Sequence, residues 1–130
     1  MLSQAPLGSV VLIDCLTLWL TGLLDAHDAW TDAATQDAAL SVIADRTESL
    51  AVALLRSNAD VIVVTNEVGQ GVVPPTASGR MFRDALGRLN AAIAAVADTA
   101  DFVVAGRSVP MATFESAGVS TGTTVDEANA

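Results

Sequence analysis

The segment from Val61 to Asn90 constrains the fold of this 130-residue chain more than any other. It begins with four apolar residues that favour β-structure, VIVV, and changes at once to the polar triplet Thr65-Asn66-Glu67. Such a run is typical of a strand covered on both faces, as in parallel sheets. In open α/β sheets the ligand crevice lies beyond the carboxyl ends of the strands. The segment therefore predicts a strand, a ligand loop, and a helix that carries Arg80 and Arg83.

Similar strand and helix patterns recur along the rest of the chain. The expected strands are Val10–Ile13, which ends at Asp14, Val61–Val64 and Asp101–Ala105; the expected helices are Leu16–Leu24, the Gly- and Pro-free Asp32–Arg56, and a helix from Ser78, as N-cap, to about Ala97. Strands that alternate with helices of this length indicate an α/β fold with right-handed crossovers and a mainly parallel sheet. Three strands so apolar form only part of a sheet, and they require further neighbours or another chain.

The charge of the chain excludes several classes of function. Fifteen acidic residues, six arginines and no lysine give a net charge of −9. This field repels nucleic acid, because binding to the phosphate backbone needs Lys or Arg. Without lysine, a G-x-x-x-x-G-K-[ST] phosphate loop cannot form from these residues. Cys15 and His27 are the only cysteine and the only histidine, which excludes an intrachain disulfide and a multi-histidine metal site.

The composition predicts a cytoplasmic protein without a membrane span. The apolar stretch Val10–Leu24 is shorter than the roughly 20 residues that cross a bilayer, and Asp14 interrupts it. It also lacks the basic start of a signal peptide, since no Lys or Arg precedes Arg46. Residues 115–130 are rich in Gly, Ser, Thr and acid, and we expect them to form a disordered tail.

Acidic side chains end both of the first two predicted strands. Asp14 closes one apolar run and Glu67 follows the other. If these strands are parallel neighbours, both carboxylates reach one edge of the sheet, where they favour a cation or a donor-rich ligand. A strand-terminal acid that holds Mg²⁺ beside a nucleotide is the Walker-B arrangement. Two alternatives remain: Asp14, with Thr17, caps the next helix, or Asn66 satisfies backbone groups in a polar turn.

The arginines of the predicted helix 78–97 are the candidate anion ligands. Arg80 and Arg83 lie one turn apart near its start, on a stripe that also includes Asn90. Guanidinium groups there can fork onto phosphate or carboxylate oxygens. The alternative is a salt bridge to Asp84 or Glu67 on a solvated face.

The Gly and Pro residues ahead of this helix define its loop. Gly69 and Gly71 can bring backbone N–H groups close to an anion, although a tight turn is the simpler interpretation of a lone G-x-G. Pro74 and Pro75 stiffen the loop.

Four blocks of sequence carry a family resemblance. They are VLIDCLTLWLTGLL (Val11–Leu24), VTNEVGQGVVP (Val64–Pro74), GRMFRDALGRLN (Gly79–Asn90) and FVVAGR (Phe102–Arg107). In this order and spacing the chain resembles the adenosylcobinamide kinase/adenosylcobinamide-phosphate guanylyltransferase family of cobalamin biosynthesis. The resemblance covers roughly Val10 to Val109.

This resemblance implies a RecA-like P-loop sheet in three layers, with flanking helices, and assembly as a trimer. It implies phosphoryl transfer from ATP or GTP to adenosylcobinamide, and guanylyl transfer from GTP to the resulting phosphate through a guanylylated histidine. The implied ligands are adenosylcobinamide, GTP or ATP, and Mg²⁺, with no permanently bound cofactor.

The chain departs from the family pattern in what it lacks. Family members begin with a strand, a G-x-x-x-x-G-K-S loop and the nucleotide-carrying histidine, all ahead of the block that Val10 opens. We therefore expect residues 1–114 to be the carboxyl-terminal part of a truncated P-loop domain without a catalytic residue of its own. His27 follows the Asp14 block and does not replace the family's nucleophile. Gln70 and Pro75 also differ from the usual family residues.

Roles carry over from the family position by position. Asp14 matches the strand-end acid that contacts the nucleotide or its Mg²⁺, and Thr17 and Glu67 belong to the same nucleotide- or metal-binding group. The residues assigned to substrate or phosphate binding are Thr65, Asn66, Arg80, Arg83 and Asn90.

Three hypotheses for the function follow. The first is part of this enzyme, competent only together with the missing P-loop segment. The second is a non-catalytic interaction module that keeps the nucleotide fold. The third is a fragment of another P-loop kinase.

Overall fold

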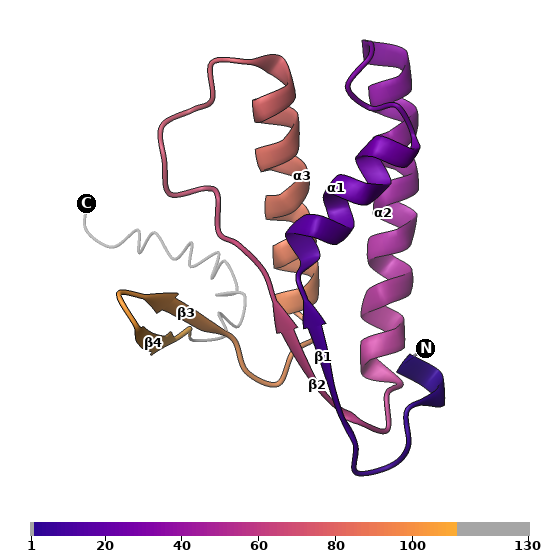
Figure 1. Cartoon of the computed structure of the whole chain (residues 1–130), viewed down its shortest axis with the longest axis vertical. Helices are drawn as coiled ribbons and strands as arrows, with labels where there is room; N and C mark the ends of the chain where they lie inside the picture. The colour runs from indigo at the N-terminus through magenta and orange to yellow at the C-terminus, as the bar shows by residue number, and fades with distance from the viewer. Residues whose placement is uncertain (1, 112–130) are drawn as a thin grey trace, which may run out of the picture. The chain divides into compact units, whose positions relative to one another are not determined.

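The computed structural model describes residues 2–111, and the expected tail, 115–130, lies outside them. The described part of the chain divides into two compact units, residues 2–99 and 100–111. The first contains η1 (Leu2–Gln4), β1 (Val10–Asp14), α1 (Leu16–Ala26), α2 (Ala33–Leu55), β2 (Asp60–Val64) and α3 (Ala77–Ala94) (Figure 1). The second contains β3 (Asp101–Val104) and β4 (Arg107–Pro110).

The first two predicted strands pair in parallel, as the sequence indicates (Figure 1). The register sets Val10 opposite Asp60 and Asp14 opposite Val64, so that both strands end at the same edge. The connection between them runs through α1 and α2, and such a long crossover is what parallel strands require. The expected α/β character of the chain is therefore confirmed, as a small parallel sheet with helices.

One face of this sheet is covered and the other is not. Ile13 and Val63 pack against the helices, whereas the alternate side chains Val10, Leu12, Ile62 and Val64 are 62%, 61%, 54% and 40% exposed. The expectation of strands buried on both faces, in three layers, is therefore not met by residues 2–99. Parallel sheets are normally covered on both sides. The apolar side chains of the exposed face indicate that this face is normally buried, and the polypeptide that would cover it is not among residues 2–99.

The hydrophobic core lies between the three helices. Its fully buried large side chains are Leu16, Leu20 and Leu24 of α1, and Leu86 and Leu89 of α3. Their spacing of three and four residues places them along one side of each helix. α2 adds Ala39 and Ile43, and its small residues allow α1 and α3 to pack closely. Trp30 joins the α1–α2 connection to α3 through Phe82, with ring centroids 6.4 Å apart.

Side-chain caps define where α2 and α3 begin. The Asp32 carboxylate accepts a hydrogen bond from the Thr35 amide, 2.9 Å, and the Thr35 hydroxyl oxygen accepts one from the Asp32 amide, 3.3 Å, which makes a capping box. At α3 the N-cap is Thr76, whose hydroxyl accepts from the Gly79 amide at 3.1 Å. The predicted N-cap, Ser78, is wrong by two residues, because either hydroxyl suits this role and the loop geometry selects the earlier one.

The third predicted strand belongs to a different sheet. β3 pairs antiparallel with β4 instead of extending the parallel pair. The turn between them, Ala105-Gly106, has positive φ at both residues, 50° and 70°. A two-residue turn of this kind matches the twist of a hairpin. Gly106 was expected only to end the strand, and here it also reverses the chain.

Among residues 2–111, no helix combines the length and apolar character needed to cross a membrane.

We predict that Leu20→Ala destabilises the first unit far more than Leu18→Ala on the same helix. Leu20 is fully buried, whereas Leu18 is 70% exposed. Truncating a buried leucine costs about 2–5 kcal/mol through lost burial and the remaining cavity, and an exposed one roughly 0.5 kcal/mol or less. Chemical denaturation followed by circular dichroism measures both. Equal losses would contradict the assigned packing of α1.

The Asp32 cap makes a pH-dependent prediction. Hydrogen bonds from the Thr35 amide and hydroxyl hold the pKa of Asp32 below its ordinary value. Stability from this carboxylate is therefore present above its unfolded pKa of about 4 and is lost as pH falls through the lower folded pKa. Asp32→Ala should lower Tm at pH 7, and the difference from wild type should shrink toward pH 2.5. Asp32→Asn, which keeps an acceptor oxygen, is the control; a Tm loss independent of pH in Asp32→Ala would contradict the charge effect.

Candidate functional site

The candidate site lies at the carboxyl ends of the parallel strands. Asp14 is the last residue of β1, and its register partner Val64 is the last residue of β2. Thr65, Asn66 and Glu67 follow directly, so these residues and Asp14 leave the sheet at one edge. The shared edge that the sequence predicted is therefore present, and all four side chains are exposed.

A chain of hydrogen bonds connects this edge to two helices. Asn66 donates to the Thr17 hydroxyl of α1 from its side-chain amide, 2.9 Å, and from its backbone amide, 3.2 Å. Thr65 donates from its hydroxyl to Oδ1 of Asn90 on α3, 2.7 Å. Asn90 donates from Nδ2 to the Asn66 carbonyl, 3.0 Å. We call these four residues, Thr17, Thr65, Asn66 and Asn90, the polar clamp.

The two acids at this edge have different surroundings. The Glu67 carboxylate accepts a hydrogen bond from the Gly69 amide within its own loop. The Asp14 carboxylate accepts no hydrogen bond from residues 2–111, and α1 begins at an N-cap, Cys15, without a side-chain cap bond. The alternative in which Asp14 caps α1 is thus not what the structure shows. The peptide bond between Asp14 and Cys15 is cis.

Both candidate arginines have partners within the chain. Arg80 donates from Nη1 to the carbonyl oxygens of Pro74 and Pro75, 3.0 and 2.9 Å. Arg83 forms an ion pair with Asp84, Nη2 to Oδ1 2.9 Å, which is the alternative that the sequence left open. Arg80 therefore fastens the end of the Gly/Pro loop to α3, and its charge is not paired with a carboxylate among the described residues.

Close packing sets the path of the loop into α3. A Cβ on Gly79 would lie 2.9 Å from Cβ of Pro74 and 2.9 Å from Oγ1 of Thr76. Only glycine therefore allows this approach of the loop to the first turn of the helix. The prolines were predicted to stiffen the loop, and their carbonyls also serve as acceptors for Arg80, which the sequence did not indicate.

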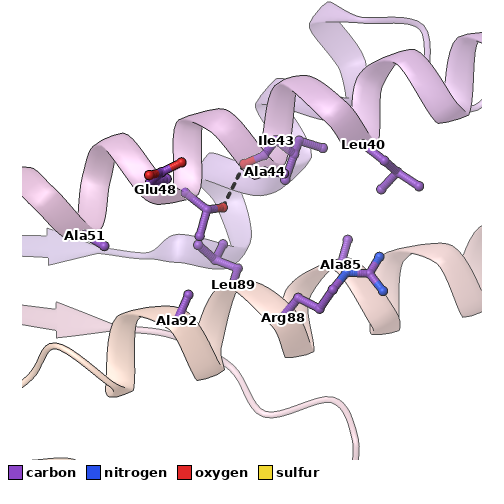
Figure 2. A pocket seen from close by; sticks show the side chains of 10 residues that line it. Leu40, Ile43, Ala44, Glu48, Ala51, Ala85, Arg88, Leu89 and Ala92 are labelled. Atoms are coloured by element: carbon purple, nitrogen blue, oxygen red, sulfur yellow. Dashed lines mark hydrogen bonds between the residues drawn. The ribbon is translucent and has the colours of Figure 1, made fainter.

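A groove between α2 and α3 was not predicted from the sequence. It has a volume of about 390 Å³ and apolar walls that include Ile43, Ala51 and Leu89. Figure 2 shows Glu48 of α2 and Arg88 of α3 at its rims. No motif marks it, because its lining is mostly alanine and leucine from two helices that are separated in the sequence.

A tightly held structural metal has no basis in the described residues. Residues 2–111 contain no group of three or more His, Cys, Asp or Glu side chains placed to hold an ion. A Mg²⁺ ion that arrives with a nucleotide needs only one or two carboxylates, because phosphates and water complete its octahedron. The single exposed carboxylate of Asp14 fits that second kind of site.

The fold and site together define a mixed α/β protein with polar residues at the carboxyl edge of a parallel sheet, consistent with part of a nucleotide-binding fold. The chain belongs to the cobinamide kinase/cobinamide phosphate guanyltransferase family, whose model matches residues 1–111.

Named relatives agree with this assignment. The bifunctional adenosylcobalamin biosynthesis protein CobU of Salmonella typhimurium is 41% identical over 101 residues, which are 76% of this chain and 56% of that protein. CobU of Escherichia coli is 40% identical over 108 residues, 78% and 58% respectively. CobP of Pseudomonas aeruginosa is 35% identical over 109 residues, 84% and 57%. The chain spans a little over half the length of these relatives.

We predict that Arg80→Ala loosens the loop ahead of α3. Removing the guanidinium leaves the Pro74 and Pro75 carbonyls to water, at a net cost of about 0.5–1.5 kcal/mol. Limited proteolysis should then cleave after the exposed Val72 several-fold faster than in wild type. Arg88→Ala is the matched control, because the guanidinium of this arginine on the same helix has no hydrogen-bond partner among residues 2–111. Identical cleavage rates in the two variants would contradict a fastening role for Arg80.

Proposed function

We propose that this chain supplies part of the nucleotide site of an enzyme that phosphorylates adenosylcobinamide and transfers guanylate from GTP to adenosylcobinamide phosphate. The carrying observation is the edge where β1 and β2 end together, with Asp14 beside the Thr65-Asn66-Glu67 segment. Family membership supports the choice of reaction, because the matched family is defined by these two activities.

The proposed ligands are GTP or ATP, adenosylcobinamide and Mg²⁺. Asp14 would hold the nucleotide's Mg²⁺, with Thr17 and Glu67 nearby, and the ion would neutralise charge on the phosphates. Arg80 and Arg83 lie in the first two turns of α3, where their guanidinium groups would bind phosphate oxygens or oxygens of the substrate. Arg83 reaches a ligand only by leaving Asp84, whereas Arg80 keeps unused donors on its guanidinium.

A phosphate loop has to come from polypeptide outside this sequence. The chain contains no lysine, and phosphoryl transfer depends on backbone donors and a lysine around the terminal phosphates. The exposed apolar face of Val10, Leu12, Ile62 and Val64 offers a place for that polypeptide. Both strands also have a free edge within the described part of the chain. We propose that a P-loop-bearing segment covers this face, within a homo-oligomer of the trimeric type.

The second candidate is a non-catalytic module of the same fold. Glu67, Arg80 and Arg83 all bind partners within the chain. This observation favours the second candidate, because side chains that are already paired have less capacity to bind a ligand. The two candidates differ in the response to the complementary polypeptide. If the chain is part of the enzyme, it becomes active when the complementary polypeptide is added. If it is a non-catalytic module, it binds that polypeptide and forms no product.

We predict that the purified chain alone binds GTP only weakly and turns over neither reaction, because it lacks the groups that hold and neutralise the phosphates. Equilibrium dialysis with labelled GTP and a product assay on adenosylcobinamide measure this. Mixing with the P-loop-bearing portion of a relative, the part that this chain does not match, should restore product formation.

The exposed sheet face provides the control for that mixture. Leu12→Asp places a charge at its centre and should abolish the gain, whereas Leu7→Asp, on the loop before β1, should not. Kinase activity of the chain alone would overturn the proposed need for a separate phosphate loop. Binding of the two polypeptides without product would favour the non-catalytic module.

A further inference from the structure

We propose that Asn90 and Thr17 are positioning residues that hold the start of the β2–α3 loop between two helices, and thereby fix Glu67 relative to Asp14. The proposal rests on the function proposed above for this edge of the sheet. It assigns the polar clamp to the orientation of the site, in addition to the ligand-binding role that the sequence predicted for its members.

Asn90 contacts two consecutive residues with the two ends of its amide. Oδ1 accepts from the Thr65 hydroxyl at 2.7 Å, and Nδ2 donates to the Asn66 carbonyl at 3.0 Å. A side chain that grips one residue by its hydroxyl and the next by its backbone fixes both position and direction of the chain. Asn90 is half-buried on α3, beside the buried Leu89, so the helix core fixes the base of the amide.

Thr17 holds the same segment from the opposite side. Its hydroxyl oxygen accepts from both the backbone and the side-chain amide of Asn66, at 3.2 and 2.9 Å. Thr17 follows the fully buried Leu16, which anchors this turn of α1 in the core. The pair of residues after β2 is thus bound to α1 and to α3 at once, across sequence separations of 49 and 25 residues.

Beyond the clamp, the half-buried Val68 packs against the hydrophobic core, but the loop makes no further hydrogen bond to α1 or α3 before Pro74 among the described residues. Residues 65–76 contain no helix or strand, and within residues 2–111 the Glu67 carboxylate accepts a hydrogen bond only from the Gly69 amide of its own loop. The other fixed point is the far end, where Arg80 and Thr76 act. The clamp is therefore the one anchor at the strand end of the loop among the described hydrogen bonds. Glu67 is the first residue beyond it, and Asp14 lies three residues before Thr17 in the sequence, at the end of β1.

Two threonine variants test the proposal in the full chain. Thr17→Val keeps the shape of the side chain and removes the hydroxyl, whereas Thr17→Ser keeps the hydroxyl. Thr21→Val on the same helix is the matched control, because the only partner of the Thr21 hydroxyl in the described part of the chain is the Thr17 carbonyl of its own helix. Asn90→Ala removes the other half of the clamp.

Amide hydrogen exchange by mass spectrometry reports the clamp without any ligand. Thr17→Val and Asn90→Ala should each raise exchange in residues 66–69 by about five- to tenfold, the effect of one or two lost hydrogen bonds. Thr17→Ser and Thr21→Val should stay within about twofold of wild type, and peptides of α2 should not change in any variant. Unchanged exchange at 66–69 in both Thr17→Val and Asn90→Ala would overturn the proposal, as would an equal rise throughout α2.

A second measurement separates this inference from the proposed function. In the mixture with the P-loop-bearing polypeptide, GTP affinity should fall about five- to tenfold in Thr17→Val and return in Thr17→Ser. Loosened exchange with unchanged GTP affinity would overturn the link between the clamp and the site. If wild type in that mixture binds no GTP, the proposed function fails, and the exchange data alone decide whether Asn90 and Thr17 position the loop.

Discussion

The parallel pairing of β1 with β2 is the constraint on which the site depends. Its register brings the last residue of each strand to one edge, and Asp14 meets the Thr65–Glu67 segment only for this reason. A parallel pair has slanted and slightly weaker hydrogen bonds, and its strands here are separated by α1 and α2. The helices therefore have to hold the pair together, through Ile13 and Val63 on the covered face. The geometry of the site therefore depends on the packing of the helices against the covered face of the sheet.

The sequence was sufficient for the first two strands and their parallel direction, because apolar runs that end in polar residues are typical of strands in a parallel sheet. It was insufficient for the layers. A run such as Val61–Val64 shows that both faces suit burial, and it does not show which polypeptide covers them. The hairpin after Asp101 escaped prediction for a different reason: Ala105 at φ 50° is an unusual turn residue, where Asn or Asp would have signalled a two-residue turn.

The sequence predicted which residues lie at the carboxyl edge of the sheet, but it did not predict the hydrogen bonds that they form. Asp14, Thr65, Asn66 and Glu67 were placed at one edge from pattern alone, and they lie there. Their hydrogen bonds depend on the exact approach of α1 and α3, which periodicity does not give. The hydrogen bond from Asn66 to Thr17 joins residues that are 49 positions apart in the sequence. Arg80 donates to two proline carbonyls and not to a carboxylate among the described residues. The sequence predicted Ser78 as the N-cap in place of Thr76, because each hydroxyl precedes a backbone amide that needs an acceptor.

The charges at this edge explain why the chain needs further groups to hold a nucleotide. Asp14 and Glu67 are both exposed there, and Arg83 is already neutralised by Asp84. Arg80 supplies positive charge, but the chain as a whole carries −9. Such a field disfavours a triphosphate and favours a cation or neutral donors. Phosphates become acceptable once Mg²⁺ binds at the carboxylates and backbone donors with a lysine arrive from a phosphate loop. In the enzyme proposed above, the acidic edge would therefore form the metal-binding half of the site, and the cationic half would lie on other polypeptide.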